Sequence, residues 1–270
     1  MARNSSFVHP LWRHRELIYR LAERDVLGRY RGSLVGWLWT FMHPLAMLAI
    51  YTFVFSQVFK ARWSSAGAPQ GPLEFAINLF AGLIVFNLAS ECITRSPLLI
   101  PANPNFVKKI IFPLEILSAV NLASSLVHAL TSLFVLMIFE ILAYGSVQLT
   151  VLWLPVVWLP LILLSLSVSW ILSAIGVYFR DLGQLSGVFM SALLFLSPIF
   201  FPLSALPARW QPFLALNPLS FLIEQTRVVV VSGHAPSFRM LLLVVLMTGL
   251  AAELSYRFFM RMKPGFADVI

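Results

Sequence analysis

Few ionisable side chains of this chain lie within or beside its apolar stretches. Such groups are costly in lipid and are therefore candidates for function. The acidic ones are Glu91, Glu115, Glu140 and Glu253. Three of them lie near the ends of apolar stretches that face a strongly basic side, and only Glu140 is placed as a possible site residue. The sequence offers no pair of carboxylates at a spacing that suits proton or sodium transfer.

The motifs that carry out hydrolysis or hold cofactors are missing from the sequence. Its four lysines all lie outside the G-x-x-x-x-G-K-[ST] motif, so the chain cannot bind ATP through a P-loop of its own. Its five histidines show no metal-ligand spacing, and no G-x-S-x-G nucleophile motif occurs. We therefore expect no catalytic residue, bound cofactor or metal in this chain. This disfavours an enzyme and favours a conduit that is driven from elsewhere.

The composition is typical of a membrane protein. Of 270 residues, 59% are hydrophobic and 11% are charged, whereas a soluble domain is about 45–50% apolar and about a quarter charged. In a membrane protein the net charge of +8 is a signal of which side of the membrane the basic loops occupy. We therefore do not interpret it as a nucleic-acid-binding charge, and we expect no nucleic-acid partner. The single cysteine, Cys92, excludes an intrachain disulfide.

Six apolar stretches are long enough to cross about 30 Å of hydrocarbon as helices. They are residues 36–59, 75–94, 114–144, 151–178, 185–201 and 240–259. Lysine and arginine number 14 in one set of alternate loops and termini and 5 in the other, which predicts both termini in the cytoplasm. Because no linker or repeat divides the chain, we expect one all-α polytopic domain over residues 1–270, without a removable signal peptide.

Three segments outside these spans have patterns of their own. Residues 11–24 are amphipathic at the helical period, which predicts a helix in the cytoplasmic interface, either a simple anchor or a moving gate. Loop 95–113 contains four prolines and a short helix after Asn103, which suits docking to a soluble partner or plain interfacial anchoring. Residues 202–239 are cut by prolines into pieces shorter than a span. We expect them to form re-entrant helices at the outer leaflet rather than an amphipathic outer loop.

The first predicted span carries an aromatic stripe. Together with Pro44 and Leu48, its members lie on one helical face: Trp37, Phe41, Tyr51, Phe55 and Phe59. Such a stripe is more often a lipid-facing or packing surface. The functional alternative is a channel wall, because flat apolar faces let sugar rings slide without strong hydrogen bonds.

A set of motifs in this sequence resembles that of ABC-type polysaccharide export permeases. The first, R-D-V-L-G-R-Y-R-G-S-L-V-G-W-L-W at 24–39, precedes the first span as the family's N-terminal signature does. The others are N-P-N-F-V-K-K-I-I-F-P-L at 103–114, Y-F-R-D-L at 178–182, S-P-I-F-F-P at 197–202 and N-P-L at 217–219. Their order and spacing agree over nearly the whole chain, and the first is closer to the O-antigen and teichoic-acid branch than to the capsule branch.

The resemblance implies a homodimer in the bacterial inner membrane that pairs with two copies of a separate nucleotide-binding ATPase subunit. The complex would move undecaprenyl-linked polysaccharide of the O-antigen type to the outer face, with ATP and Mg²⁺ on the partner. Segment 11–31 would lie at the substrate gate, 95–113 would be the coupling loop, and the aromatic stripe would line the channel. The residues that contact the ATPase would be Asn103, Asn105, Phe106, Lys108, Lys109, Arg180 and Asp181.

A basic cluster before the first span has two interpretations. It consists of Arg20, Arg24, Arg29 and Arg31. Because guanidinium groups bind phosphate oxygens bidentately, the cluster could hold the pyrophosphate of the lipid-linked glycan. The simpler interpretation is the positive-inside signal alone.

Other functions fit parts of this pattern. A related ABC export permease could carry a drug or another small lipid-like cargo, and its channel would need no continuous aromatic wall. An ion-driven secondary transporter would need a titratable group in the membrane, and replacing Glu140 with Gln would then abolish transport. A membrane-embedded glycosyltransferase is disfavoured by the missing acidic catalytic cluster.

Overall fold

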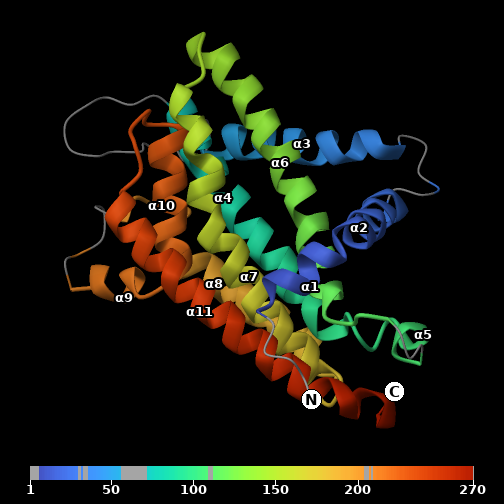
Figure 1. Cartoon of the computed structure of the whole chain (residues 1–270). Coiled ribbons are helices and arrows are strands. Elements are labelled where there is room, and N and C mark those ends of the chain that lie inside the picture. The colour runs from blue at the N-terminus through green and yellow to red at the C-terminus, as the bar shows by residue number, and fades with distance from the viewer. Residues whose placement is uncertain are drawn as a thin grey trace.

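The computed structural model describes residues 6–29, 32, 36–55, 72–108, 112–203, 207 and 209–269, and within them all regular secondary structure is helical (Figure 1). This confirms the all-α prediction. The α-helices are α1 (Val8–Arg13), α2 (Arg15–Arg29), α3 (Trp39–Phe53), α4 (Pro72–Arg95), α5 (Pro104–Val107), α6 (Ile116–Tyr144), α7 (Leu154–Gly176), α8 (Leu182–Phe195), α9 (Gln211–Ala215), α10 (Pro218–Val230) and α11 (Phe238–Met262). Short 3₁₀ turns are η1 (Gly36–Leu38), η3 (Ser96–Leu98), η4 (Leu149–Trp153) and η6 (Lys263–Asp268).

Four helical stretches among the described residues are long and apolar enough to cross a membrane. They are Leu73–Leu98, Ile116–Tyr144, Leu149–Gly176 and Phe238–Asp268. They correspond to four of the six predicted spans. The other two predictions fall on α3 and α8, whose 15 and 14 residues are fewer than the roughly 20 that a span needs. The first predicted span also extends to Phe59, outside the described residues, so the count of six stays a prediction.

Helix α4 is the centre of the molecule. In the most apolar 18-residue stretch of this helix 83% of the residues are buried, whereas in the corresponding stretch of α11 22% are buried. It packs against α3, α6, α7, α8 and α10, while α11 packs mainly along α7 and leaves most of its leucines exposed. A helix that is apolar on every side and buried belongs in a core, whereas one with an exposed apolar face suits contact with lipid.

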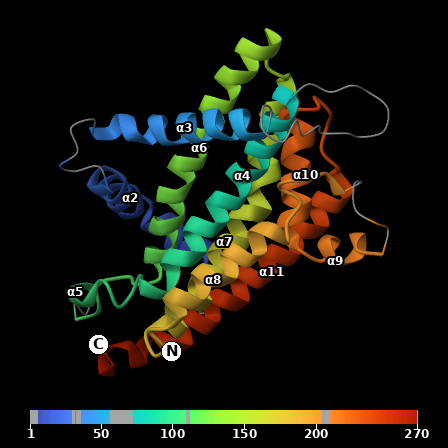
Figure 2. The ribbon, with the colours of Figure 1, turned by 180° about the vertical axis from the view of Figure 1, so that it is seen from behind.

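Helix α3 does not run alongside the long helices. Both views show it lying crosswise over α6 (Figures 1 and 2), and it contacts α6 and α4. Pro44 and Leu48 are buried in this contact. The inward face of α3 is therefore the face that the sequence pattern singled out.

The predicted amphipathic helix 11–24 is divided in two at His14, where α1 ends and α2 begins. Most of its predicted apolar face does point inward, and α2 packs against α6. The Trp12 side chain is 70% exposed. The break at His14 interrupts the helical period, and the Arg15 guanidinium lies 5.1 Å from the centre of the Trp12 ring.

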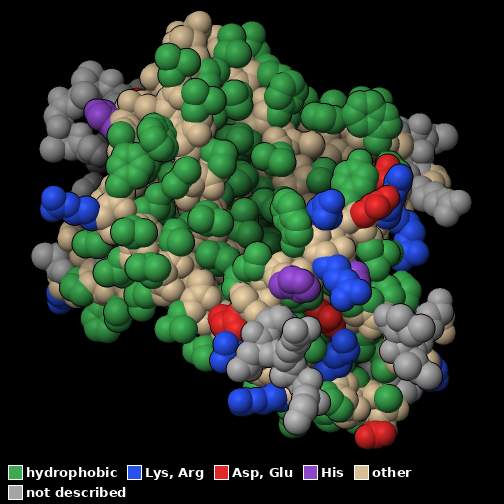
Figure 3. Space-filling view, in the orientation of Figure 1, with side chains coloured by type: hydrophobic (Ala, Val, Ile, Leu, Met, Phe, Trp, Pro, Cys, Tyr) green, Lys and Arg blue, Asp and Glu red, His purple; other side chains and the backbone are tan. Residues whose placement is uncertain are grey.

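Charged side chains gather at one end of the molecule. We call the basic end the region where α4, α7 and α11 end and α6 begins. The space-filling view shows Lys, Arg, Asp, Glu and His crowded around α1 and α2 and a mostly hydrophobic surface elsewhere on that face (Figure 3). At this end Lys263 pairs with Glu115 at 2.6 Å, and Phe266 of η6 is buried.

Candidate functional site

A network of charged side chains joins α2 to α4 and α6 at the basic end. The Arg95 guanidinium, at the end of α4, donates to both carboxylate oxygens of Asp25 on α2, at 2.9 and 2.8 Å. This bidentate pairing is the strong geometry for arginine and a carboxylate. Arg29 adds a longer contact of 3.5 Å to the same carboxylate. The two charged side chains of α2, Asp25 and Arg29, therefore lie one helical turn apart and both face α4.

Glu91 of α4 is the second acceptor of the network. It forms an ion pair with Arg29, and its two oxygens lie 3.2 and 3.1 Å from Nδ1 of His128 on α6. The same nitrogen lies 3.1 Å from Nη1 of Arg29, so its tautomer decides whether it donates to Glu91 or accepts from Arg29. One carboxylate therefore links three helices that are distant in sequence.

The network changes the protonation of Asp25. Partial burial alone raises the pKa of the Asp25 carboxyl, but the hydrogen bonds and charge of Arg95, together with the charge of Arg29, outweigh burial and hold this pKa below its usual range. Asp25 is therefore ionised at neutral pH and keeps its pairing with α4.

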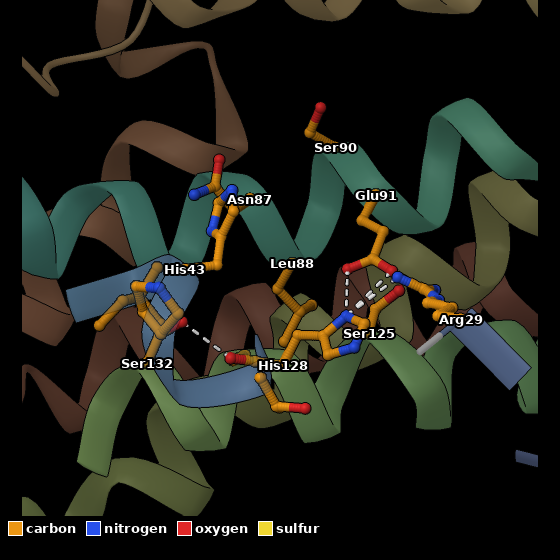
Figure 4. Close-up of a pocket in the computed structure, with 13 residues that line it drawn as sticks. Arg29, His43, Asn87, Leu88, Ser90, Glu91, Ser125, His128 and Ser132 are labelled. Carbon is orange, nitrogen blue, oxygen red and sulfur yellow. Dashed lines mark hydrogen bonds and ion pairs between the residues drawn. The ribbon is translucent and has the colours of Figure 1, made fainter. Parts of the chain in front are cut away.

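A cavity of about 410 Å³ opens beside the network, between α2, α3, α4 and α6. In the close-up, Arg29, Glu91 and His128 meet at one side of it and His43 and Asn87 lie at the other (Figure 4). Its remaining polar wall consists of Thr40, Ser90, Ser125 and Ser132. Hydroxyl, amide, imidazole and guanidinium groups together suit a ligand that carries both phosphate and hydroxyl oxygens.

The other predicted arginines lie outside this cavity. Arg20 is exposed and lies 3.8 Å from Glu23. Arg24 is exposed and lines a separate small cavity between α2 and the loop that follows α4. Arg31 lies outside the described residues. Among the arginines of the predicted cluster that the structure describes, Arg29 is the one that lines this cavity.

Four members of the predicted aromatic stripe are described, and each touches another ring. Trp37 packs edge-on against Phe41, and Phe41 against Phe134 of α6. Phe55 stacks on Phe75 at 5.1 Å and lies 6.5 Å from Tyr51. These contacts hold α3 on α4 and α6, while Trp37 remains largely exposed. Phe59 lies outside the described residues, and the channel role stays a prediction.

The loop after α4 is fixed to the body of the molecule at its root. The Ser96 hydroxyl donates to the Cys92 carbonyl at 2.6 Å and lies 2.7 Å from the Ser169 hydroxyl, within hydrogen-bond distance. Pro97 lies so close to Gly176, the last residue of α7, that an added Cβ would overlap the Pro97 carbonyl oxygen. This backbone contact requires glycine, and it ties the loop to both α4 and α7.

The predicted ATPase-contacting residues follow this fixed root. Asn103 precedes α5 and donates to the Leu99 carbonyl at 2.9 Å, and Phe106 stacks on Phe112 at 4.2 Å. Asn105 and Lys108 are exposed, and Lys109 lies outside the described residues.

Arg180 and Asp181 are also exposed, in the turn between α7 and α8. Two residues further, Gly183 lies against Leu98 of η3. The two predicted contact segments are therefore neighbours at the basic end.

At mid-length of the bundle, the motifs 197–202 and 217–219 meet each other. The Asn217 side chain donates to the Ser197 hydroxyl at 2.9 Å, and its oxygen accepts from the Leu219 N–H and caps α10. The start of α10 is thus joined to the end of α8. From there α10 runs toward the opposite end, where Thr150 donates to the Val229 carbonyl at 2.6 Å.

Arg227 is the residue of this region that sequence reasoning missed. It was counted only as a loop charge, yet its side chain is 3% exposed. Its guanidinium donates to the carbonyls of Asn78, Pro198 and Ile199 at 2.6–2.9 Å and to Glu224 at 3.0 Å. The available signal was its position directly before four valines and three residues after a glutamate.

The sequence profile of the family described as "ABC-2 type transporter" matches residues 16–231. An "O-antigen export system permease protein RfbA" of Myxococcus xanthus is 26% identical over 232 residues, 85% of this chain and 85% of that protein. A protein of the same name from Klebsiella pneumoniae is 25% identical over 220 residues, 81% of each chain. A "Polysialic acid transport protein KpsM" of Escherichia coli is 26% identical over 242 residues, 84% of this chain and 88% of that protein.

The matched segment begins in α2, ends at the close of α10 and contains the charged network, the cavity and the buried arginine. It covers well over half of the chain, and the proteins named for glycan export match over similar lengths. This chain is therefore a multi-pass membrane protein of the ABC-2 type transporter family.

Proposed function

We propose that this protein is the membrane subunit of an ATP-driven exporter that moves undecaprenyl-linked polysaccharide of the O-antigen type across the bacterial inner membrane. Both termini would lie in the cytoplasm. The chain would act as a homodimer with two copies of an ATPase subunit, which would bind ATP and Mg²⁺, and would hold no cofactor itself. Its fold would have six spans, with α3 and α8 as parts of the first and fifth, and α9 and α10 as outer re-entrant helices.

The observation that carries this proposal is the extent of the similarity to glycan exporters. Relatives named for O-antigen export and for polysialic acid transport match more than four-fifths of this chain. The similarity therefore includes the segments that would contact cargo and partner, and not only a shared membrane scaffold.

The cavity beside Arg29 supports a cargo that carries phosphate. In the contacts described, Arg29 pairs with the Glu91 side chain and with no backbone carbonyl. The pyrophosphate of the cargo could therefore take the place of the Glu91 carboxylate and would bring two phosphate groups to the guanidinium. The serine, threonine and asparagine groups of the same cavity would accept the first sugar residues. In this proposal Arg20, Arg24 and Arg31 supply the basic approach to the gate.

The fixed root of loop 95–113 supports coupling to the ATPase. A displacement of the loop at Asn105 or Lys108 would be transmitted to α4 and α7, because Ser96 and Pro97 fix the root of the loop to these helices. Coupling of this kind is reciprocal, so cargo should alter nucleotide turnover. The aromatic stripe of α3 would then line the path that opens between the two copies.

Co-purification tests the proposal directly. A tagged chain isolated from its native host should bring an ATPase subunit with it, and lipid-linked glycan should change the ATPase rate of the complex. The variant Lys108→Glu should reduce the recovered ATPase on the order of tenfold, as loss of one central interface charge can. Arg239→Glu, exposed at the start of α11, is the matched control and should leave recovery unchanged. A chain that purifies alone, with no nucleotide-dependent behaviour, would refute the proposal.

One observation favours a small lipid-like cargo as the second candidate. An almost wholly apolar cavity of about 460 Å³ lies between α4, α7, α8 and the start of α10. Its volume is in the range of small-molecule sites. If this cavity holds the cargo, Ser186→Trp at its wall should block export while Arg29→Gln leaves it intact. The polysaccharide proposal expects Arg29→Gln to be the damaging change.

A further inference from the structure

A second polar cavity lies at the opposite end of the molecule from the charged network. It has a volume of about 340 Å³ and is formed where α4 begins, α6 ends and α10 ends. Glu140 and His128 are twelve residues apart on α6, which places the two cavities about 18 Å apart along that helix. The residues that line it are Glu74, Glu140, Tyr144, Ser146, Gln148, Val230 and Val231.

Glu140 is the unusual member of this set. It is 4% exposed, and neither carboxylate oxygen has a hydrogen-bond partner among the described residues. No Lys, Arg or His belongs to the described lining of the cavity. A buried carboxylate without a partner costs several kcal/mol, so such a group normally acquires a counter-charge or a proton.

The other groups around Glu140 are oxygen donors. Glu74 supplies a second carboxylate, and Tyr144, Ser146 and Gln148 supply hydroxyl and amide oxygens. The Gln148 side chain lies close against Gly233, where an added Cβ would stand 2.6 Å from its Oε1. Carboxylate, hydroxyl and amide oxygens are the ligands that hard cations prefer, and imidazole and thiol, which suit zinc or copper, are missing from this described lining.

We propose that this cavity binds a hard divalent cation of the Ca²⁺ class, with Glu140 as its central ligand and Glu74 as the second carboxylate. With two carboxylates and otherwise neutral oxygens, the site fits the weak range of extracellular calcium modules, a Kd on the order of 10⁻⁴–10⁻³ M. The ion would tie the end of α10 to α4 and α6. The proposal needs neither the cargo nor the ATPase of the preceding section.

Terbium luminescence tests the site on the full-length chain. Tb³⁺ has the ligand preference of Ca²⁺, and Tyr144 in the cavity wall can transfer excitation to it. The protein would be held in nanodiscs of neutral phosphatidylcholine, so that lipid headgroups do not compete. We expect saturable Tb³⁺ emission that Ca²⁺ displaces. Glu140→Gln should weaken binding by roughly tenfold or more, and Glu74→Gln by severalfold.

The controls separate loss of the site from loss of the fold. Glu16→Gln removes an exposed carboxylate of α2 and should bind Tb³⁺ as the unchanged protein does. If Glu140→Gln fails to fold, as judged by size-exclusion chromatography, the half-buried Glu74→Gln decides the question. Equal binding by Glu74→Gln and the unchanged protein, or by Glu140→Gln where it folds, overturns the proposal. So does emission that Ca²⁺ cannot displace, or a Glu140 carboxyl that infrared spectroscopy finds protonated at neutral pH in saturating Ca²⁺.

Discussion

Arg29 and Arg227 are guanidinium groups that both face the central helix α4, but their surroundings differ. The Arg29 side chain is 28% exposed, faces a cavity and pairs with the carboxylates of Glu91 and Asp25. The Arg227 side chain is 3% exposed and is held by three backbone carbonyls as well as Glu224.

The two arginines differ in whether the groups bound to the guanidinium can be replaced by another ligand. A carboxylate that is bound by arginine can be replaced by another anion at modest cost, because both partners remain partly hydrated. The carbonyls of Pro198 and Ile199 belong to a segment between helices, where no helical N–H group could take the place of the Arg227 guanidinium as their donor. In the proposed function Arg29 is available to bind an anion, whereas Arg227 stabilises a turn.

Removing Arg227 should have the largest effect. Arg227→Met keeps much of the side-chain volume but leaves three buried carbonyls and Glu224 without their donor, and we expect a loss of about 3–5 kcal/mol in stability. Thermal unfolding of the purified chain in detergent measures it. Arg239→Met, at an exposed position of α11, should cost less than about 0.5 kcal/mol. Equal melting of the two variants would show that the buried arginine is not structural.

Gly82→Ala tests how firmly that arginine is held. The added Cβ would stand 2.7 Å from Arg227 Nη2 and 3.3 Å from Ile223, so one of them must move. Because Arg227 is fixed by its hydrogen bonds, we expect a loss of about 1–3 kcal/mol, as for other overpacked cores. Gly249→Ala on α11, which meets no neighbour within 4 Å, should be neutral or slightly stabilising in the same melting assay. An unchanged melting temperature for Gly82→Ala would mean that Arg227 can shift freely.

Glu91→Gln tests the exchangeable arginine. Removal of the carboxylate leaves Arg29 with His128 Nδ1 at 3.1 Å and with the Asp25 carboxylate at 3.5 Å, so stability should fall by about 1 kcal/mol while the guanidinium becomes more available to an external anion. We expect undecaprenyl pyrophosphate to bind the purified complex severalfold more tightly. Glu16→Gln on the exposed side of α2 should change neither property. Weaker lipid binding by Glu91→Gln would show that Glu91 orders the cavity rather than competing within it.

Sequence reasoning reached the helical class and four spans because length and hydropathy determine them. It also predicted that the loops around Lys108 and Arg180 lie on one side of the membrane, because both are basic; the structure adds that Gly183 and Leu98 bring these loops together. It named Arg29 only as one of four arginines, and the sequence pattern could not show which of the four lines the cavity. This depends on which side of α2 faces α4, and that is set by Asp25 and Arg95, which are 70 residues apart.

The role of Arg227 could not be predicted, for a physical reason. Its partners are carbonyls, which every residue has, so no side-chain pattern marks them. Pro198 and Ile199 follow Ser197, whose hydrogen bond to Asn217 joins the start of α10 to the end of α8, so their closeness to Arg227 depends on a tertiary contact. The sequence supplied the two motifs, and the structure supplied their contact.

Asp25→Asn should give the smallest effect and one that depends on pH. The pKa of the Asp25 carboxyl is lowered in the folded protein, so its stabilising contribution is present above the unfolded value of about 3.9 and is lost as pH falls through the lower folded pKa. Asn cannot ionise, so Asp25→Asn should be less stable than the unchanged protein at pH 6 by less than about 1 kcal/mol, since the pair is partly exposed. The two should converge below about pH 4. Melting temperatures of both proteins across this range test it, with Asp181→Asn as an exposed control. A constant difference at every pH would mean that Asp25 contributes through shape and hydrogen bonding alone, and that the charge of α2 matters to its docking only through Arg29.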